Sequence, residues 1–264
     1  MHFGQKKRRF NSISRRFFAV LVTFLSCFAR AYSAENDVPS YPAPTFDQAR
    51  EWYGFAKTNY LNKPDDPVAA VKFAEACFEW AEFARSSEER APLALEGIAA
   101  ARVAVLKAPK EPGGYFFLAM NKGQLARTKT LGALPLVKEM EAAFLQAIKL
   151  DPKFDNASAE RSLGMLYMDA PGWPTSIGSN SKARKHLERA VELAPEYPTN
   201  LLTLIDAYLR WEEEDALHKA MQRYRKLMLT AREKYSGPKW GNSWKDWDAR
   251  WKMIQEKNQE LFSE

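Results

Sequence analysis

The sequence predicts an all-α protein, a helical-repeat solenoid of about four enlarged helix pairs with capping helices. Three observations carry this prediction. Apolar residues recur three and four positions apart throughout residues 45–262, which is the spacing of one helix face. Similar segments that end in proline recur along the chain. Their interval of 41 to 43 residues leaves room for two helices in each unit.

The repeat is clearest at the end of the second helix of each pair. Three segments spaced 43 residues apart share an alanine and a closing proline: Ala104–Pro109, Ala147–Pro152 and Ala190–Pro195. Proline ends each of these helices because it has no N–H to donate. Two further columns match in size: Ala101, Phe144 and Leu187, and Gly97, Met140 and Ala183. A fourth copy follows at a spacing of 41, with Tyr224, Met228 and Ala231.

The third copy resembles the tetratricopeptide repeat. Its first helix carries a large apolar residue, a small residue and a tyrosine, and its second carries the Ala, apolar, Ala and Pro positions of that signature: Leu163, Gly164, Tyr167, Ala183, Leu187, Ala190 and Pro195. A small residue where helices cross lets the two backbones approach closely. The second copy is degenerate, because Asn121 stands in the column of Gly164 and leaves the register open. The resemblance implies a solenoid whose first helices face a concave side.

These units are about nine residues longer than the 34-residue standard, mostly between the two helices. The extra length lies in residues 170–178 of the third copy and 128–134 of the second. Repeat number, an export leader and these loops make the chain similar, over residues 45–262, to the periplasmic T-component of TRAP solute transporters. That resemblance implies a non-catalytic scaffold that binds a protein, such as a periplasmic solute-binding subunit.

Residues 1–33 have the pattern of a signal peptide. Basic residues precede an apolar run, Phe17–Leu25, that is shorter than the roughly 20 residues of a membrane span. We therefore expect a linker at 34–44, a repeat domain at 45–238, a Trp-rich capping helix at 239–264, and export to the bacterial periplasm or cell envelope. Three alternatives stay open: an uncleaved anchor, twin-arginine export through Arg15 and Arg16, and lipidation of Cys27, the one route to membrane association.

Composition excludes several classes of function. The first 34 residues hold seven basic residues and no acidic one, so the rest of the chain, with 32 basic and 33 acidic residues, is near neutral. This balance argues against nucleic acid as a partner. His2, His186 and His218 are scattered, and no phosphate loop or nucleophile motif is present, so we expect no enzyme activity, no metal and no cofactor.

The tryptophans near the end of the sequence have two competing interpretations. Trp240, Trp244, Trp247 and Trp251 form one aromatic stripe, which predicts either a cap on the end of the solenoid or a docking face for a partner. Cys77 is expected to be a small buried apolar group.

The predicted binding site lies at the enlarged inner loops. Trp173, in a loop with two prolines and a glycine, would offer an aromatic wall, and Arg127 and Lys129 of the preceding loop would offer two cations. Asn121, Arg161 and Tyr167 on the first helices would complete the site. A protein partner is the first hypothesis, and a small organic acid or lipid in a pocket at these loops is the alternative. Burial of Trp173 in a local core and self-association of the chain also stay open.

Overall fold

The computed structural model describes residues 45–129 and 132–257. The predicted signal peptide and linker lie outside this part of the chain. Within it the structure is helical, with ten α-helices, one 3-10 helix and no strand beyond an isolated bridge between Gly172 and Gly178. The helices are α2 (Phe46–Asn62), α3 (Pro67–Ala81), α4 (Ser87–Lys107), α5 (Pro112–Arg127), α6 (Ala133–Leu150), α7 (Phe154–Asp169), α8 (Asn180–Leu193), α9 (Pro198–Trp211), α10 (Glu214–Lys234), η2 (Pro238–Trp240) and α11 (Gly241–Lys257). The predicted all-α class is confirmed.

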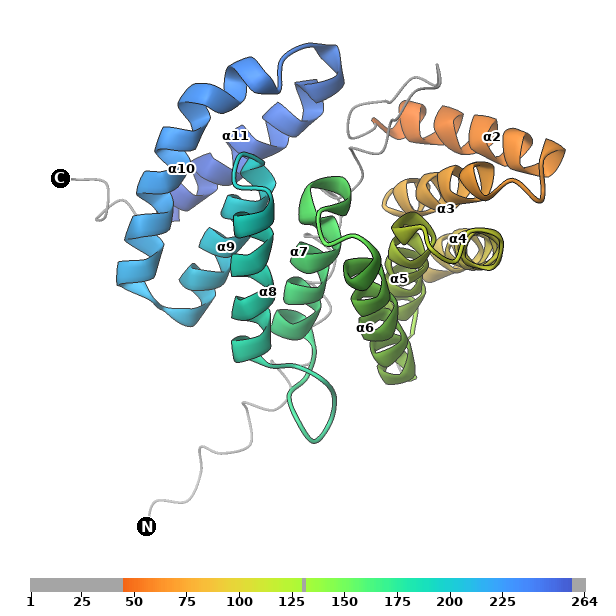
Figure 1. Ribbon diagram of the computed structural model, residues 1–264, viewed down its shortest axis with the longest axis horizontal. Coiled ribbons are helices and arrows are strands. Elements are labelled where there is room, and N and C mark those ends of the chain that lie inside the picture. Colours follow the sequence, from red (N-terminus) through yellow and green to blue (C-terminus); the bar gives the residue numbers. More distant parts are fainter. Residues whose placement is uncertain (1–44, 130–131, 258–264) are drawn as a thin grey trace.

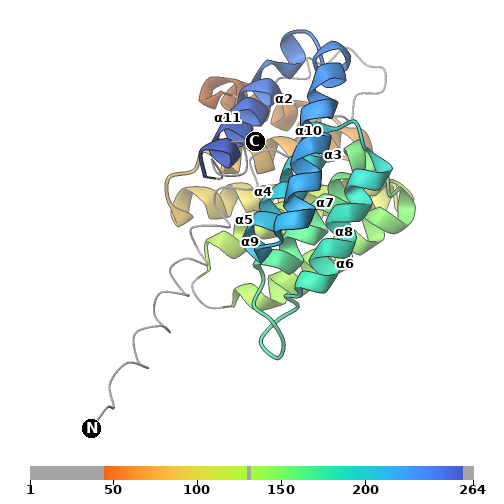
Figure 2. The same ribbon diagram turned by 90° about the vertical axis from the view of Figure 1, so that its left-hand side faces the viewer.

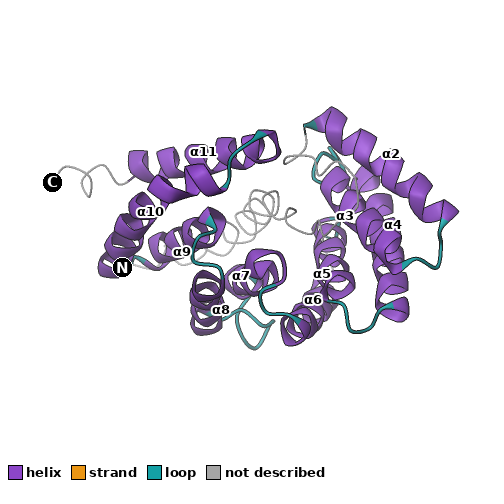
Figure 3. Ribbon diagram, turned by 45° about the horizontal axis from the view of Figure 1, so that its top comes forward, coloured by secondary structure: helices purple, strands orange, loops and turns teal. Residues whose placement is uncertain are grey.

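Four helix pairs follow one another in an arc: α3/α4, α5/α6, α7/α8 and α9/α10. Their first helices, α3, α5, α7 and α9, lie along the inner side of the arc, and α4, α6 and α8 lie outside (Figure 3). Helix α2 lies at one end of the arc and α11 at the other. The predicted helical-repeat solenoid is therefore confirmed.

Sequence determines where several helices begin. The Thr45 hydroxyl caps α2 by accepting a hydrogen bond from the backbone N–H of Gln48. The side-chain oxygen of Gln48 in turn accepts from the backbone N–H of Thr45. Ser86 and Ser179 cap α4 and α8 in the same way. Three helices start with proline, which lacks the N–H that a first helical turn leaves unpaired: Pro67, Pro112 and Pro198.

The turn between successive pairs recurs with the period of the sequence. Ala108, Asp151 and Ala194, 43 residues apart, each donate a backbone hydrogen bond to the alanine four residues earlier, at 2.8, 2.9 and 3.1 Å. The carbonyls of these residues then accept from Glu111, Phe154 and Tyr197 at 3.0, 3.2 and 3.2 Å. This shared geometry shows that the alanine column marks equivalent positions in three dimensions.

Close approach of the paired helices explains the small residues. A Cβ added at Gly164 would lie 2.7 Å from the Leu187 side chain and 3.2 Å from the Ala183 carbonyl oxygen of α8. A Cβ added at Gly123 would likewise lie 3.1 Å from the Met140 side chain of α6. Since Met140 and Ala183 share a column, Gly123 is the counterpart of Gly164.

The prediction that Asn121 occupies the position of Gly164 is therefore wrong. Gly123, two residues later, occupies it, so the repeat register of the second copy shifts by two residues. The Asn121 side chain instead packs on the preceding pair. A Cβ added at Gly97 of α4 would come within 2.1 Å of the Asn121 amide oxygen. The amide nitrogen donates to the carbonyl of Ala74 at 2.8 Å.

The third pair holds two more residues than the fourth between its turn and its tyrosine. Phe154 precedes Tyr167 by 13 residues, whereas Tyr197 precedes Tyr208 by 11. The difference coincides with a left-handed start of α7, where Asp155, Asn156 and Ala157 have φ of 45°, 55° and 60°. Asn and Asp tolerate this conformation better than most residues. The two extra residues of the third pair are thus accommodated in the left-handed turn at the start of α7.

Helix α11 packs against the last pair through the tryptophan stripe. Trp247 is 1% exposed, and its indole N–H donates to the Thr199 hydroxyl of α9 at 2.8 Å. Trp244 donates to the backbone of Tyr235 at 2.7 Å, and Trp251 packs on Tyr224 of α10 at 4.7 Å between ring centroids. The stripe thus faces the solenoid, as a cap does.

We expect Gly164→Ala to lower the free energy of unfolding by about 1–3 kcal/mol, because the new methyl group would overpack the α7/α8 crossing. Gly54→Ala is the matched control. Gly54 lies in an exposed helix position with nothing within 4 Å of the added Cβ, so the same change should stabilise by about 0.5–1 kcal/mol. Urea unfolding of both variants checks the prediction, and equal effects would contradict the close helix contact.

Candidate functional site

Trp173 is the most exposed large apolar side chain in the described part of the molecule, at 89%. It lies in the connection between α7 and α8, which projects beyond the ends of the helices (Figures 1 and 2). The interpretation of Trp173 as a local core is therefore wrong. Tryptophan is enriched among the residues that anchor protein interfaces, so Trp173 is a candidate contact residue.

Backbone hydrogen bonds close this loop at its base. Gly178 donates to the Pro171 carbonyl at 2.9 Å, Ser179 donates to Tyr167 at 2.9 Å, and Thr175 donates to Gly172 at 3.0 Å. A Cβ added at Gly178 would lie 2.1 Å from the Ala170 carbonyl oxygen, so only glycine fits where the two sides of the loop meet. The loop thus presents Trp173 from a defined base.

Arg127 is buried in an ion pair. Its guanidinium lies 2.8 Å from the Glu82 carboxylate, and the two side chains are 3% and 11% exposed. Gln124 donates to the same carboxylate. Lys129 lies two residues beyond α5 and is exposed. The structure therefore separates the two predicted cations, one inside the protein and one at its surface.

The same kind of pair recurs between the third and fourth units. Arg210, near the end of α9, bonds Asp169, the last residue of α7, at 2.6 Å. Burial raises the pKa of the Asp169 carboxyl above its ordinary value, and the hydrogen bond from Arg210 opposes this rise. Each pair joins the ends of two neighbouring first helices. These pairs stabilise the arc. They were not predicted from the sequence, although acidic and basic residues alternate at the ends of the four first helices: Glu82, Arg127, Asp169 and Arg210.

The other three predicted site residues are buried and make internal bonds. Asn121 bridges α5 to the first pair, as described above. Arg161 bonds the side chain of Asn200 and lies 5.4 Å from the centre of the Tyr197 ring. Tyr167 donates to Glu141 at 2.6 Å, and Lys182 lies 4.8 Å from its ring centre. Burial, then the Glu141 bond, raise the pKa of Tyr167 above its ordinary value. A binding role for these residues stays a prediction.

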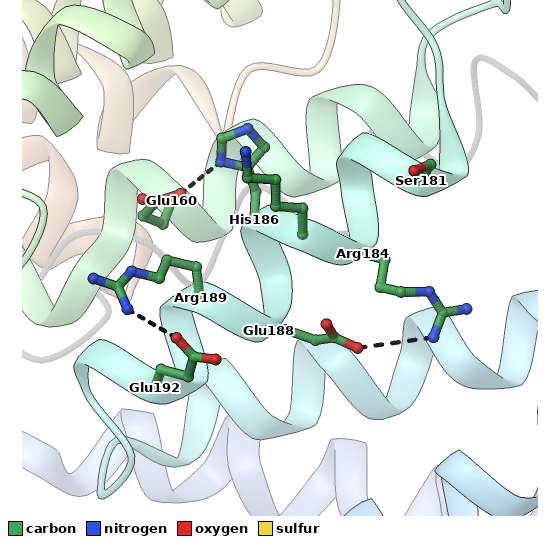
Figure 4. A pocket seen from close by; sticks show the side chains of 8 residues that line it. Glu160, Ser181, Arg184, His186, Glu188, Arg189 and Glu192 are labelled. Carbon is green, nitrogen blue, oxygen red and sulfur yellow. Dashed lines mark hydrogen bonds and ion pairs between the residues drawn. The ribbon is translucent and has the colours of Figure 1, made fainter.

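A polar depression of about 540 Å³ lies along the outer face of α8. Figure 4 shows its charges in pairs: His186 points toward Glu160 at 2.6 Å, Arg189 toward Glu192 at 2.8 Å, and Arg184 toward Glu188 at 3.8 Å. Ser181 lies apart from His186 in this view. The depression therefore shows no nucleophile beside a base, and it is separate from the inner side of the arc.

Three polar residues on the face of α9 that meets α11 were also not predicted from the sequence. Thr199, Thr203 and Asp206 follow one another at i, i+4 and i+7, so a polar stripe in an otherwise apolar helix was the available signal. Trp247 of α11 bonds Thr199, and Arg250 bonds Thr203 at 3.3 Å and Asp206 at 2.7 Å. The face of α9 that meets α11 thus binds an aromatic residue and an arginine of α11.

The described residues show neither a metal-binding cluster nor a membrane-spanning helix. They contain no group of three or more His, Cys, Asp or Glu placed to hold a metal ion. Within residues 45–129 and 132–257, no helix has both the length and the apolar content to cross a bilayer. Cys77 is fully buried in α3, and burial raises the pKa of its thiol.

Comparison with known proteins supports the fold. No family model and no curated protein matches the chain. Among solved structures, the chain is similar to TTC0263, a thermophilic TPR protein of Thermus thermophilus, with a TM-score of 0.59 and 15% identity over 91% of this chain and 98% of that one. A crystal structure of MamA matches with a TM-score of 0.44 and 18% identity over 72% of this chain and 90% of that one. The fold is a tetratricopeptide-like solenoid.

We expect Arg127→Met to destabilise the protein by about 3 kcal/mol, because it leaves the Glu82 carboxylate buried without its cation. Arg189→Met is the control: its pair with Glu192 is 52% and 62% exposed, so the loss should be under about 1 kcal/mol. Urea unfolding measures both. Adding Glu82→Gln to Arg127→Met should restore part of the stability. Equal losses in the two single variants would argue against a structural role for Arg127.

Proposed function

We propose that this chain is a non-catalytic scaffold that binds a protein partner, and that the loop around Trp173 is a contact site. One observation carries the proposal: Trp173 is almost fully exposed on a loop whose base is closed by hydrogen bonds. Aromatic residues held in a defined position are typical anchors of protein interfaces.

The arrangement of charge supports a scaffold over an enzyme. Arg127, buried at the end of α5, bonds the Glu82 carboxylate within the solenoid, and the more exposed Arg210 bonds the buried Asp169 in the same way. Charged groups used in this way hold the arc together. Similarity to other solenoids of this fold supports the same conclusion, because stacked helix pairs offer an extended surface to a partner.

A finer proposal places the scaffold in the periplasm, beside a solute transporter of the TRAP type. It rests on the leader pattern of residues 1–33 and on the sequence resemblance. N-terminal sequencing of the protein from its native cells tests export, because cleavage would leave a new terminus near residue 32 or 34. Co-purification with a solute-binding subunit tests the transporter.

The alternative, a small organic acid or lipid in a pocket at the inner loops, has less support. The depression described above lies on the outer face of α8, and its charges other than Lys185 form pairs. Arg127, which was expected to bind an anion, is bonded to Glu82.

We expect Trp173→Ala to weaken binding of the partner by about thirtyfold, the loss typical of an anchor residue at an interface. The partner is first captured from envelope extract with the wild-type chain, identified by mass spectrometry and purified. Its affinity for each variant is then measured by calorimetry. Helix content and the urea midpoint should stay at wild-type values, because Trp173 packs on so little.

Leu229→Ala is the matched control, since Leu229 is 82% exposed on α10, away from the loop. Its affinity for the partner should equal that of the wild type. Unchanged affinity of the Trp173 variant, or an equal loss in both variants, would reject the loop as a contact site.

A further inference from the structure

Helix α11 packs on one face of α9, at the end of the arc, through specific polar bonds. The indole of Trp247 donates to Thr199 at 2.8 Å, and the guanidinium of Arg250 reaches Thr203 and Asp206 at 3.3 and 2.7 Å. Trp247 and Arg250 are three residues apart on α11, so they share a face. This face of α9 therefore recognises a helix that carries a tryptophan followed by an arginine three positions later.

The contact is buried, so it discriminates among ligands. The side chains of Arg250 and Asp206 are 10% and 17% exposed. A buried carboxylate without its cation is costly, and the hydroxyls of Thr199 and Thr203 would lose their donors. Any segment that replaces α11 must therefore supply an aromatic donor and a guanidinium.

The backbone of α11 makes fewer close contacts with neighbouring helices than that of any other described α-helix, although Trp247 is buried. Each helix from α3 to α10 packs more extensively on the one before it than α11 packs on any helix. Figure 3 shows α11 alongside α9 and α10 at one end of the arc. An element with few contacts opens at lower free energy than the rest of a domain.

A hinge precedes α11. Gly237 is exposed, has φ of +91°, and has nothing within 4 Å of an added Cβ. The short helix η2 follows it, before α11 begins at Gly241. Glycine changes its backbone angles with little steric cost, so α11 can swing away while α10 keeps its place.

We propose that the face of α9 covered by α11 is a binding site for a helical segment of a partner protein with tryptophan and arginine three residues apart, and that α11 is its internal competitor. This inference rests on the proposed scaffold function and names a second contact surface and the chemistry of its partner. Binding requires α11 to leave, so the helix holds the site closed until a segment with the same pattern displaces it.

The test uses the full chain and a fluorescein-labelled peptide with the sequence of residues 240–257 as the probe. Wild type should bind the peptide weakly, because α11 competes. Trp247→Ala in the chain loosens α11 and should raise the affinity for the peptide about tenfold. Adding Asp206→Asn should remove this gain, since the arginine of the peptide then loses its carboxylate. Peptides with Trp247→Ala or Arg250→Gln should bind the loosened chain at least about tenfold more weakly.

Lys245→Ala is the control in the chain, because Lys245 is exposed on α11 and makes none of these bonds. It should bind the peptide as the wild type does. Absence of any gain in the Trp247 variant, or a gain that survives Asp206→Asn, would overturn the proposed site.

Hydrogen exchange of the wild-type chain gives a second measurement, which needs no variant to fold. Amides of α11 should exchange before those of α7 and α9, and added peptide should speed their exchange. If α11 exchanges only with global unfolding, the proposal is overturned. The Trp173 experiment reports on the scaffold function separately. Loss of partner binding there, without a peptide effect here, would reject only this inference.

Discussion

The close contact between the two helices of each pair is the constraint on which the rest of the structure depends. Gly164 meets Leu187 and the Ala183 backbone, and no larger side chain fits between them. Gly123 meets Met140 in the same way in the second pair, so close approach of the paired helices contributes to how these pairs stack. The inner side of the arc, and every surface that a partner meets there, follows from this packing of small residues.

Electrostatics then join one pair to the next. Glu82 with Arg127, and Asp169 with Arg210, connect the ends of neighbouring first helices in partly or fully buried positions. A third pair, Asp206 with Arg250, uses the same chemistry to hold α11 on α9. Most of the buried charge in the described first helices thus serves the arc itself. The residues left for recognition are those that project from it, such as Trp173, or those that a movable element covers.

These two kinds of surface differ in how they reach a partner. Trp173 is exposed in the structure as it stands, on a loop whose Ile177 packs against the core. The polar stripe of α9 is accessible only when α11 leaves. If both proposals hold, a partner would meet the open surface first, and the surface under α11 would tighten the contact only for a partner that carries the required helix.

Helix periodicity, small residues and proline act through near neighbours in the chain, so the residues alone predict the all-α class, the period of 43 residues and the turn at Ala108, Asp151 and Ala194. They also mark Trp173 as a candidate site residue. Contacts between helices were needed to show that Trp173 faces solvent, that Arg127 faces Glu82, and that Gly123 takes the place expected for Asn121. The partner of a charge or an aromatic ring comes from another helix some 40 residues away, and the exact angle and register of the stacked pairs select it.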